Sequence, residues 1–176
     1  MKTLNYFKTL ALIAVTFFFA NCTNPDRDND VYDESVTIDL SAEKITFSIN
    51  KTTQWEGTAT ITGTIKNIGD HFSSGRGQQI AYLYERSLGT PTTQLGNIVA
   101  SKSFSELASN GTLEVSFTRP WNSSSPAEGE FAPEYILVLS YDPDLFIDGN
   151  KSNDDTNHDN NEILESGIEI NNLFRN

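Results

Sequence analysis

The chain has 176 residues, with 24 aspartates and glutamates against 12 lysines and arginines, and a single cysteine. This length predicts one folded domain. The formal net charge of -12 argues against nucleic acid and anionic membrane surfaces as partners, because both bind clustered basic residues. One cysteine excludes an internal disulfide and a zinc site built from cysteines.

The first 22 residues have the pattern of an export signal. Lys2 and Lys8 precede an apolar run over residues 10–20, which is short for a membrane span but suits a signal peptide. The run ends at Cys22, and this arrangement resembles a bacterial lipoprotein signal, in which the cysteine carries the lipid. We expect a signal peptide over residues 1–21 and an outer-membrane anchor on Cys22. The alternative is an ordinary secretory signal or an anchor helix.

An acidic segment follows the cysteine. Seven acidic residues and one basic residue lie between positions 26 and 43, and such a composition buries too little apolar surface to fold. We therefore expect a disordered tether over residues 22–42. The segment resembles the acidic export signal of surface-exposed lipoproteins in the Bacteroidetes, which implies exposure at the cell surface. An orientation towards the periplasm is the alternative.

Residues 43–176 have the alternation of β-strands. Residues 44–50 and 56–67 place apolar side chains on one face and threonine or serine on the other. Five further strands are expected at residues 80–86, 95–104, 111–118, 133–142 and 164–170. In the last of these, Leu164, Ile168 and Ile170 are expected to point inward. About seven short antiparallel strands joined by turns predict an all-β sandwich.

One turn in this pattern resembles a known family. Residues 63–69 (GTIKNIG) are similar to the G-x-V-x-N-x-G strand and turn of CARDB domains, immunoglobulin-like modules named for bacterial cell-adhesion relatives. The strand before Trp121 and the Asn-Asn-Glu sequence at residues 160–162 are similar as well. The resemblance implies an immunoglobulin-like sandwich without catalytic residues that binds or spaces something outside the cell. In the turn itself, Asn67 is expected to bond its own main chain and Gly69 to have a positive φ.

The loop over residues 142–162 departs from the family pattern, because it is longer and more acidic. Its segment Asp-Thr-Asn-His-Asp at residues 155–159 alternates oxygen ligands as many calcium loops do. An EF-hand is excluded, since its sixth and twelfth positions are Asn160 and Ser166. The sequence leaves two readings open, a nonstandard calcium site or a solvated loop. The candidate ligands are Asp155, Asn157, Asp159 and Glu162.

Trp121 is the candidate ligand-binding residue. It is expected in a loop rich in proline and serine, where it would form a platform for sugar rings with Trp55, Phe131 and Tyr135. The alternative is that Trp121 closes one end of the core. Because no catalytic motif is recognised, we expect a non-catalytic cell-envelope lipoprotein that serves as an extracellular binding, adhesion or spacer module. Its partner would be a protein or a surface glycan. The alternative is a carbohydrate-binding lipoprotein of a glycan-uptake system.

Overall fold

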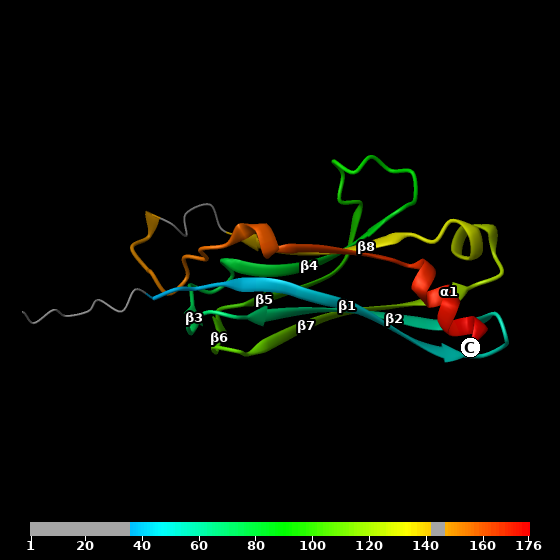
Figure 1. The fold of residues 1–176 in the computed structure, drawn as a ribbon, viewed down its shortest axis with the longest axis horizontal. Coiled ribbons are helices and arrows are strands. Elements are labelled where there is room, and N and C mark those ends of the chain that lie inside the picture. Colours follow the sequence, from blue (N-terminus) through cyan, green and yellow to red (C-terminus); the bar gives the residue numbers. More distant parts are fainter. Residues whose placement is uncertain (1–35, 142–146) are drawn as a thin grey trace, which may run out of the picture. The chain divides into compact units, whose positions relative to one another are not determined.

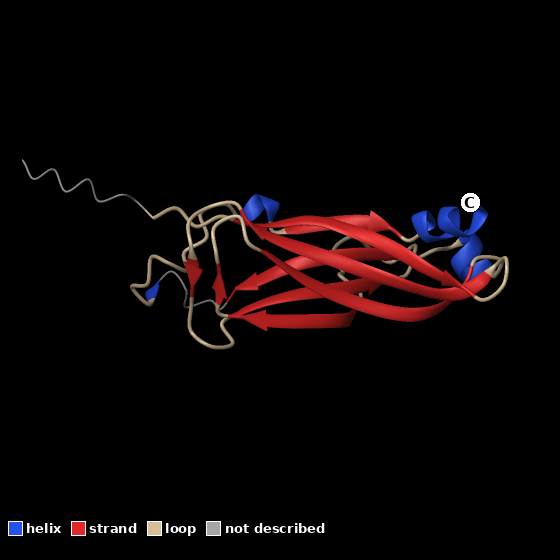
Figure 2. Cartoon of the chain, turned by 90° about the horizontal axis from the view of Figure 1, so that it is seen from below, coloured by secondary structure: helices blue, strands red, loops and turns tan. Residues whose placement is uncertain are grey.

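In the computed structural model, which describes residues 36–141 and 147–176, two antiparallel sheets pack face to face (Figure 1). One sheet has the order β1-β2-β7 and the other the order β5-β4-β8-β9, while β3 and β6 form a small ribbon. The strands are β1 (Leu40–Lys51), β2 (Glu56–Asn67), β3 (Phe72–Ser73), β4 (Gln79–Arg86), β5 (Asn97–Phe104), β6 (Glu106–Leu107), β7 (Thr112–Asn122), β8 (Glu134–Tyr141) and β9 (Glu162–Ser166). The helical segments are η1 (Pro126–Glu130), η3 (His158–Asn160) and α1 (Ile168–Arg175) (Figure 2).

The strand order is that of an immunoglobulin-like sandwich. If β1, β2, β4, β5, β7, β8 and β9 are named A, B, C, C′, E, F and G, the two sheets read A-B-E and C′-C-F-G. All the pairings within these sheets are antiparallel. The prediction of a single all-β sandwich of about seven strands is therefore confirmed.

The core lies between the two sheets, because each strand turns alternate residues inward. The inward apolar residues that are buried are Leu40, Ala42, Ile45, Ala59, Ile61, Ile65, Ala81, Leu83, Val115, Tyr135, Leu137 and Leu139. The sheets approach closely at Gly63, where a Cβ atom would lie 2.7 Å from Cδ1 of Leu137. On the opposite face of β2, the hydroxyls of Thr60 and Thr62 pair with those of Thr118 and Ser116, each at 3.0 Å.

The folded domain begins before the predicted boundary at residue 43. Ile38 and Leu40, which the acidic composition placed in the tether, are fully buried, and Leu40 is the first residue of β1. Ile38 also forms a parallel bridge with Asp155. The tether prediction is wrong for residues 36–42, because two apolar residues within an acidic run suffice to extend β1 into the core.

The same segment explains the glycine at position 69. Asn67 bonds the turn as expected, since its Oδ1 accepts from the amide of Gly69 at 3.0 Å. Gly69 does not have the expected positive φ, which the described glycines show only at positions 77, 89, 96 and 149. A Cβ on Gly69 would instead collide with the carbonyl of Thr37 and lie 2.6 Å from the amide nitrogen of Asp39. Close passage of residues 37–39 therefore requires glycine here.

The last predicted strand is correct only in its first part. It ends at Ser166, and Ile168 and Ile170 lie in α1 instead. Leu164 is 40% exposed rather than inward, while its neighbour Ile163 packs against the core. A helix replaces the strand because Ile170 and Phe174 on one face of α1 find apolar partners at the end of the sandwich. None of the helices in the described ranges is long and apolar enough to cross a membrane.

Candidate binding groove

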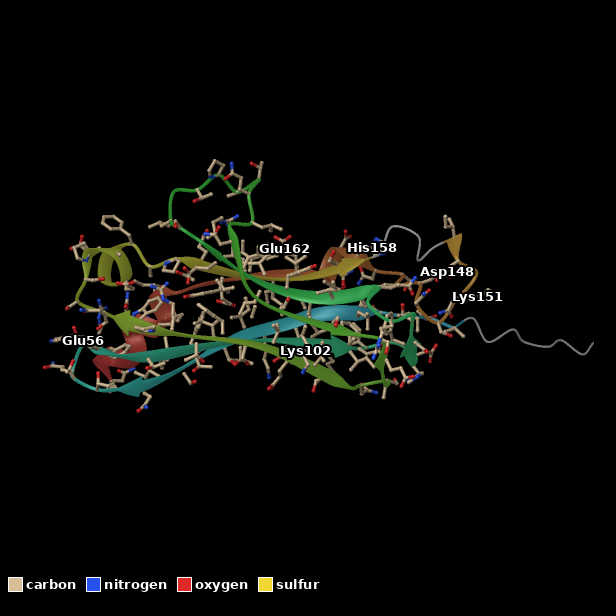
Figure 3. All side chains as sticks on the ribbon, turned by 180° about the vertical axis from the view of Figure 1, so that it is seen from behind. Glu56, Lys102, Asp148, Lys151, His158 and Glu162 are labelled. Carbon is tan, nitrogen blue, oxygen red and sulfur yellow. The ribbon has the colours of Figure 1, made fainter. Side chains whose placement is uncertain are left out.

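The end of the sandwich at the β1–β2 hairpin carries two adjoining grooves. The larger has a volume of about 520 Å³ and the smaller of about 230 Å³, and Arg119 and Glu128 line both. The larger groove is also lined by Thr52, Glu56, Trp121 and Asn122. Figure 3 shows Glu56 at this end of the domain, far from the labelled Asp148 and Lys151. We call this pair of depressions the Arg119 groove.

Two charged residues reach the groove from inward-facing strand positions. Arg119 is in phase with Val115 and Phe117 of β7, which pack into the core. Glu85 is likewise in phase with the buried Leu83 of β4. A charge in the apolar phase of a strand needs a partner, because an unpaired charge is costly to bury. A charged residue at a strand position that alternates with the core-facing apolar residues was the sequence signal that could have identified both Arg119 and Glu85.

The Arg119 guanidinium joins two carboxylates. Its Nη1 donates to Oε2 of Glu85 at 2.8 Å and its Nη2 to Oε1 of Glu128 at 2.9 Å. The guanidinium carbon also lies 5.4 Å from the ring centre of Trp121, at cation–π distance. Partial burial opposes the charged form, but the hydrogen bond and charge of Glu85 outweigh it, together with Tyr135 and Glu128, and raise the pKa of Arg119. The guanidinium is thus a fixed positive charge between two carboxylates.

Tyr135 connects this network to the core. Its side chain is fully buried, and its hydroxyl donates to Oε2 of Glu85 at 2.9 Å. Burial raises the pKa of the Tyr135 phenol well above its ordinary value, and the charge of Glu85 and the hydrogen bond to it add to this effect. The phenol therefore keeps its proton and holds Glu85 in position.

Two helical segments complete the groove. Ser125 caps η1, because its hydroxyl accepts from the Glu128 amide at 3.0 Å and donates to the Glu128 carboxylate. From α1, Asn171 accepts from the indole nitrogen of Trp121 at 2.9 Å and donates to the Glu128 carbonyl. Asn171 is 1% exposed, so this bridge is dry. One buried amide thus ties β7, η1 and α1 together beside the groove.

Trp121 does not lie in the predicted loop. It belongs to β7, which continues to Asn122, and only 2% of its surface is exposed. The rings that are open to solvent near the groove are Trp55 and Phe131, which are 42% and 58% exposed. Trp55 precedes the groove residue Glu56, and its carbonyl accepts from the amide of Ser123 at 2.8 Å. Phe131 lines the smaller groove.

The predicted calcium ligands lie at the opposite end of the domain and differ in exposure. Asp155 is 1% exposed, whereas Asn157, Asp159 and Glu162 are exposed at the surface. Within residues 36–141 and 147–176, no three histidine, cysteine, aspartate or glutamate side chains form a group that could hold a metal ion. Calcium binding by these four residues stays a prediction. Cys22, the tether up to residue 35, and Asp142 and Asp144 lie outside the described residues.

No family model, curated protein or solved structure matches this chain. The resemblance of residues 63–69 to CARDB domains therefore stays a prediction. What the groove can do follows from its own chemistry. Its lining offers a paired guanidinium, carboxylate acceptors, the amide of Asn122 and the exposed ring of Phe131, and the exposed ring of Trp55 belongs to the residue before the lining residue Glu56. Such a set suits the binding of a polar ligand by hydrogen bonds and ring contacts.

Proposed function

We propose that this protein is a non-catalytic lipoprotein of the cell envelope, whose immunoglobulin-like domain binds a partner outside the cell in the Arg119 groove. The observation that carries the proposal is the hydrogen-bonded groove, in which Arg119 and Glu85 occupy strand positions in phase with buried apolar residues. Polar networks of this kind specify geometry when every member is satisfied. The lipid on Cys22 would hold the domain at the outer membrane surface.

The position of the groove supports this role. The chain joins the domain at residues 36–40, where β1 begins, and the groove lies at the hairpin where β1 ends. A strand of 12 residues extends for ~40 Å. A tether attached at the start of β1 would thus leave the groove on the distant end of the domain. This is the orientation that a membrane-anchored binding module needs.

The charges of the groove limit its occupants. Glu56, Glu85 and Glu128 line the groove against a single guanidinium, that of Arg119, so the groove carries an excess of negative charge. The net charge of the chain has the same sign. We therefore propose a neutral or basic partner, such as a segment of a surface protein, and no nucleic acid.

A second candidate is binding of a surface glycan, as in a glycan-uptake system. The specific observation in its favour is the exposure of Trp55 and Phe131 beside the groove. Flat aromatic rings pack against the apolar faces of sugars, while the polar groups between them bond hydroxyls. Trp121 would then contribute through its cation–π contact with Arg119, and it would not itself stack on the sugar.

The experiment compares Phe131→Ala, in the lining of the smaller groove, and Trp55→Ala, next to the lining residue Glu56, with Ile68→Ala. The Ile68 side chain is 50% exposed, and neither it nor its chain neighbours line the groove. Binding of each variant is measured by affinity electrophoresis in neutral polysaccharides and by interferometry on a panel of surface proteins. We expect the two groove variants to lose about tenfold in affinity, roughly 1.4 kcal/mol, and Ile68→Ala to bind as the wild type does.

Measuring binding to both polysaccharides and surface proteins separates the two candidate functions. Loss of binding to a polysaccharide identifies a carbohydrate-binding protein, and loss of binding to a protein identifies an adhesion module. Equal binding of all three variants to every partner of the wild type would contradict the assignment of the groove. Catalytic turnover of any bound partner would contradict the non-catalytic role.

A further inference from the structure

The end of the sandwich opposite the groove has a polar interior. Asn153, Asp155 and Asn161 from the segment between β8 and β9 are 0%, 1% and 5% exposed. Figure 3 places the labelled Asp148, Lys151 and His158 of the same segment at this end, opposite Glu56. Buried polar side chains at this density require partners for each of their atoms.

Asp155 organises these residues around the start of β1. Its Oδ2 accepts from the amide of Leu40 at 3.2 Å and from Nδ2 of Asn161 at 3.4 Å, while its Oδ1 accepts from the amide of Asn157 at 3.0 Å. Its own amide donates to the carbonyl of Asn153 at 3.1 Å. The carboxylate thus fixes the backbone of β1 and of its own loop.

Three of the five asparagines in residues 147–161 share one bonding pattern. Each amide nitrogen donates to a carboxylate, from Asn153 to Asp148 at 2.9 Å, from Asn160 to Asp39 at 2.8 Å and from Asn161 to Asp155 at 3.4 Å. The amide oxygen of each is buried and has no hydrogen-bond donor. Reversing the amides would not help, because each oxygen would then face a carboxylate.

A fourth side-chain oxygen in the same segment also lacks a hydrogen-bond donor. Oδ1 of Asp154 is buried and has no donor. All four residues lie within one peptide bond or one hydrogen bond of Asp155 or of Asp39, which precedes Leu40 in the chain. Several buried oxygens without donors carry the full desolvation cost unless a cation or ordered water satisfies them.

We propose that this segment binds Ca²⁺ through the side-chain oxygens of Asn153, Asp154, Asn160 and Asn161. Calcium takes six to eight hard oxygen ligands in flexible geometry, and it accepts neutral amide oxygens together with carboxylates. Backbone carbonyls and water would complete the shell. The acidic residues that hold the asparagines supply the negative surroundings, since the described part of the segment contains five acids and one lysine between residues 147 and 162. The inference is independent of the Arg119 groove.

This ligand set replaces the one expected from the sequence. The carboxylate of Asp155 bonds backbone amides and orients Asn161, so it acts beside the ion and not on it. Asn157, Asp159 and Glu162 are exposed. The proposal thus keeps an ion in the loop that contains the alternating oxygen residues 155–159, but it assigns the ion to other side chains.

The experiment measures Ca²⁺ binding to the full-length chain by calorimetry in metal-free buffer, with Mg²⁺ as competitor. The variants are Asn153→Leu and Asn161→Leu, and the matched controls are Asn157→Leu and Glu162→Gln. We expect one Ca²⁺ per chain and a melting temperature several degrees higher at ~100 times the dissociation constant than in EDTA. The two buried variants should weaken binding about tenfold or more, and the controls less than about twofold.

Folding of each variant is checked by circular dichroism and by its melting temperature in EDTA. The proposal can be tested on the wild-type protein even where a variant does not fold. Absence of saturable Ca²⁺ binding by the wild type at millimolar concentrations would overturn it. Loss of binding in the controls but not in the buried variants would overturn the ligand assignment. Equal affinity for Mg²⁺ and Ca²⁺ would overturn the choice of ion.

Discussion

Tyr135 shows how one side chain serves both the core and the groove. Its ring packs 5.8 Å from that of Phe47, centre to centre, and its hydroxyl holds Glu85 beside Arg119. Burial and the adjacent carboxylate favour the neutral phenol and so raise its pKa. A group that keeps its proton in the folded state while the unfolded chain releases it makes stability depend on pH.

The sign of this dependence predicts alkaline destabilisation. Above pH 10.0, the unperturbed value, the unfolded phenol is deprotonated while folded Tyr135 keeps its proton. The unfolded state then binds fewer protons, so the free energy of unfolding falls as pH rises. Between about pH 9 and 11, we expect the free energy of unfolding, measured by urea denaturation, to fall less in Tyr135→Phe than in the wild type. Tyr84 contributes to the fall that remains in the variant, because burial also raises the pKa of Tyr84. Identical slopes in wild type and variant would contradict this account.

Individual residues were predictable from sequence where the cause is local. The bond from Asn67 to the Gly69 amide depends only on neighbouring atoms, and it was predicted correctly. The need for glycine at position 69 comes from the backbone of residues 37–39, some 30 positions away, and so the expected positive φ was wrong. Arg119 and Glu85 stood in the apolar phase of their strands, and this signal was visible but not used.

At the scale of elements, strands with a long alternation were found where they were expected. β2 has the predicted bounds, and β4 is central, between β5 and β8, as its two apolar faces indicated. The prediction of the C-terminal strand is wrong after Ser166, because the seven residues of alternation at 164–170 do not distinguish a strand from a short helix. The contacts that favour α1 are tertiary, since Asn171 in this helix bonds both Trp121 and η1.

The docking of α1 can be tested through Asn171. Asn171→Ala leaves the buried indole nitrogen of Trp121 and the Glu128 carbonyl without their partner. We expect it to lower the free energy of unfolding by about 2 kcal/mol. Asn172→Ala is the matched control, because Asn172 makes one exposed bond to Glu169 and should change stability by less than ~0.5 kcal/mol. Urea denaturation measures both, and equal effects would show that α1 docks without this bridge.

For the whole molecule, the sandwich separates two polar ends. The Arg119 groove lies at the β1–β2 hairpin, and the asparagine-rich segment lies where the chain joins the domain. The composition predicted the acidic loop, but it could not place the loop relative to the groove. That placement depends on the antiparallel register of β1 with β2, which carries the hairpin away from residue 36.

The lipid anchor is tested on the full chain in a Gram-negative host fed an alkyne-labelled fatty acid. We expect the wild type to carry the label and Cys22→Ser to lose it, because the thiol is the attachment point. Thr23→Ser is the control and should keep the label. Protease treatment of intact cells should remove the labelled domain if it faces outward, and protection would indicate the periplasmic orientation. An unlabelled wild type would contradict the anchor.

The register of β1 with β2 has a mechanical consequence. A pull between a membrane anchor before residue 36 and a partner held at the hairpin end would act along the axis of β1. The paired residues from Leu40–Asn67 to Lys51–Gly57 would then be loaded in shear, so that many hydrogen bonds share the force at once. If the strands were instead pulled apart from one end, their hydrogen bonds would break one after another. The same fold that presents the groove would therefore resist being drawn out by a partner under tension.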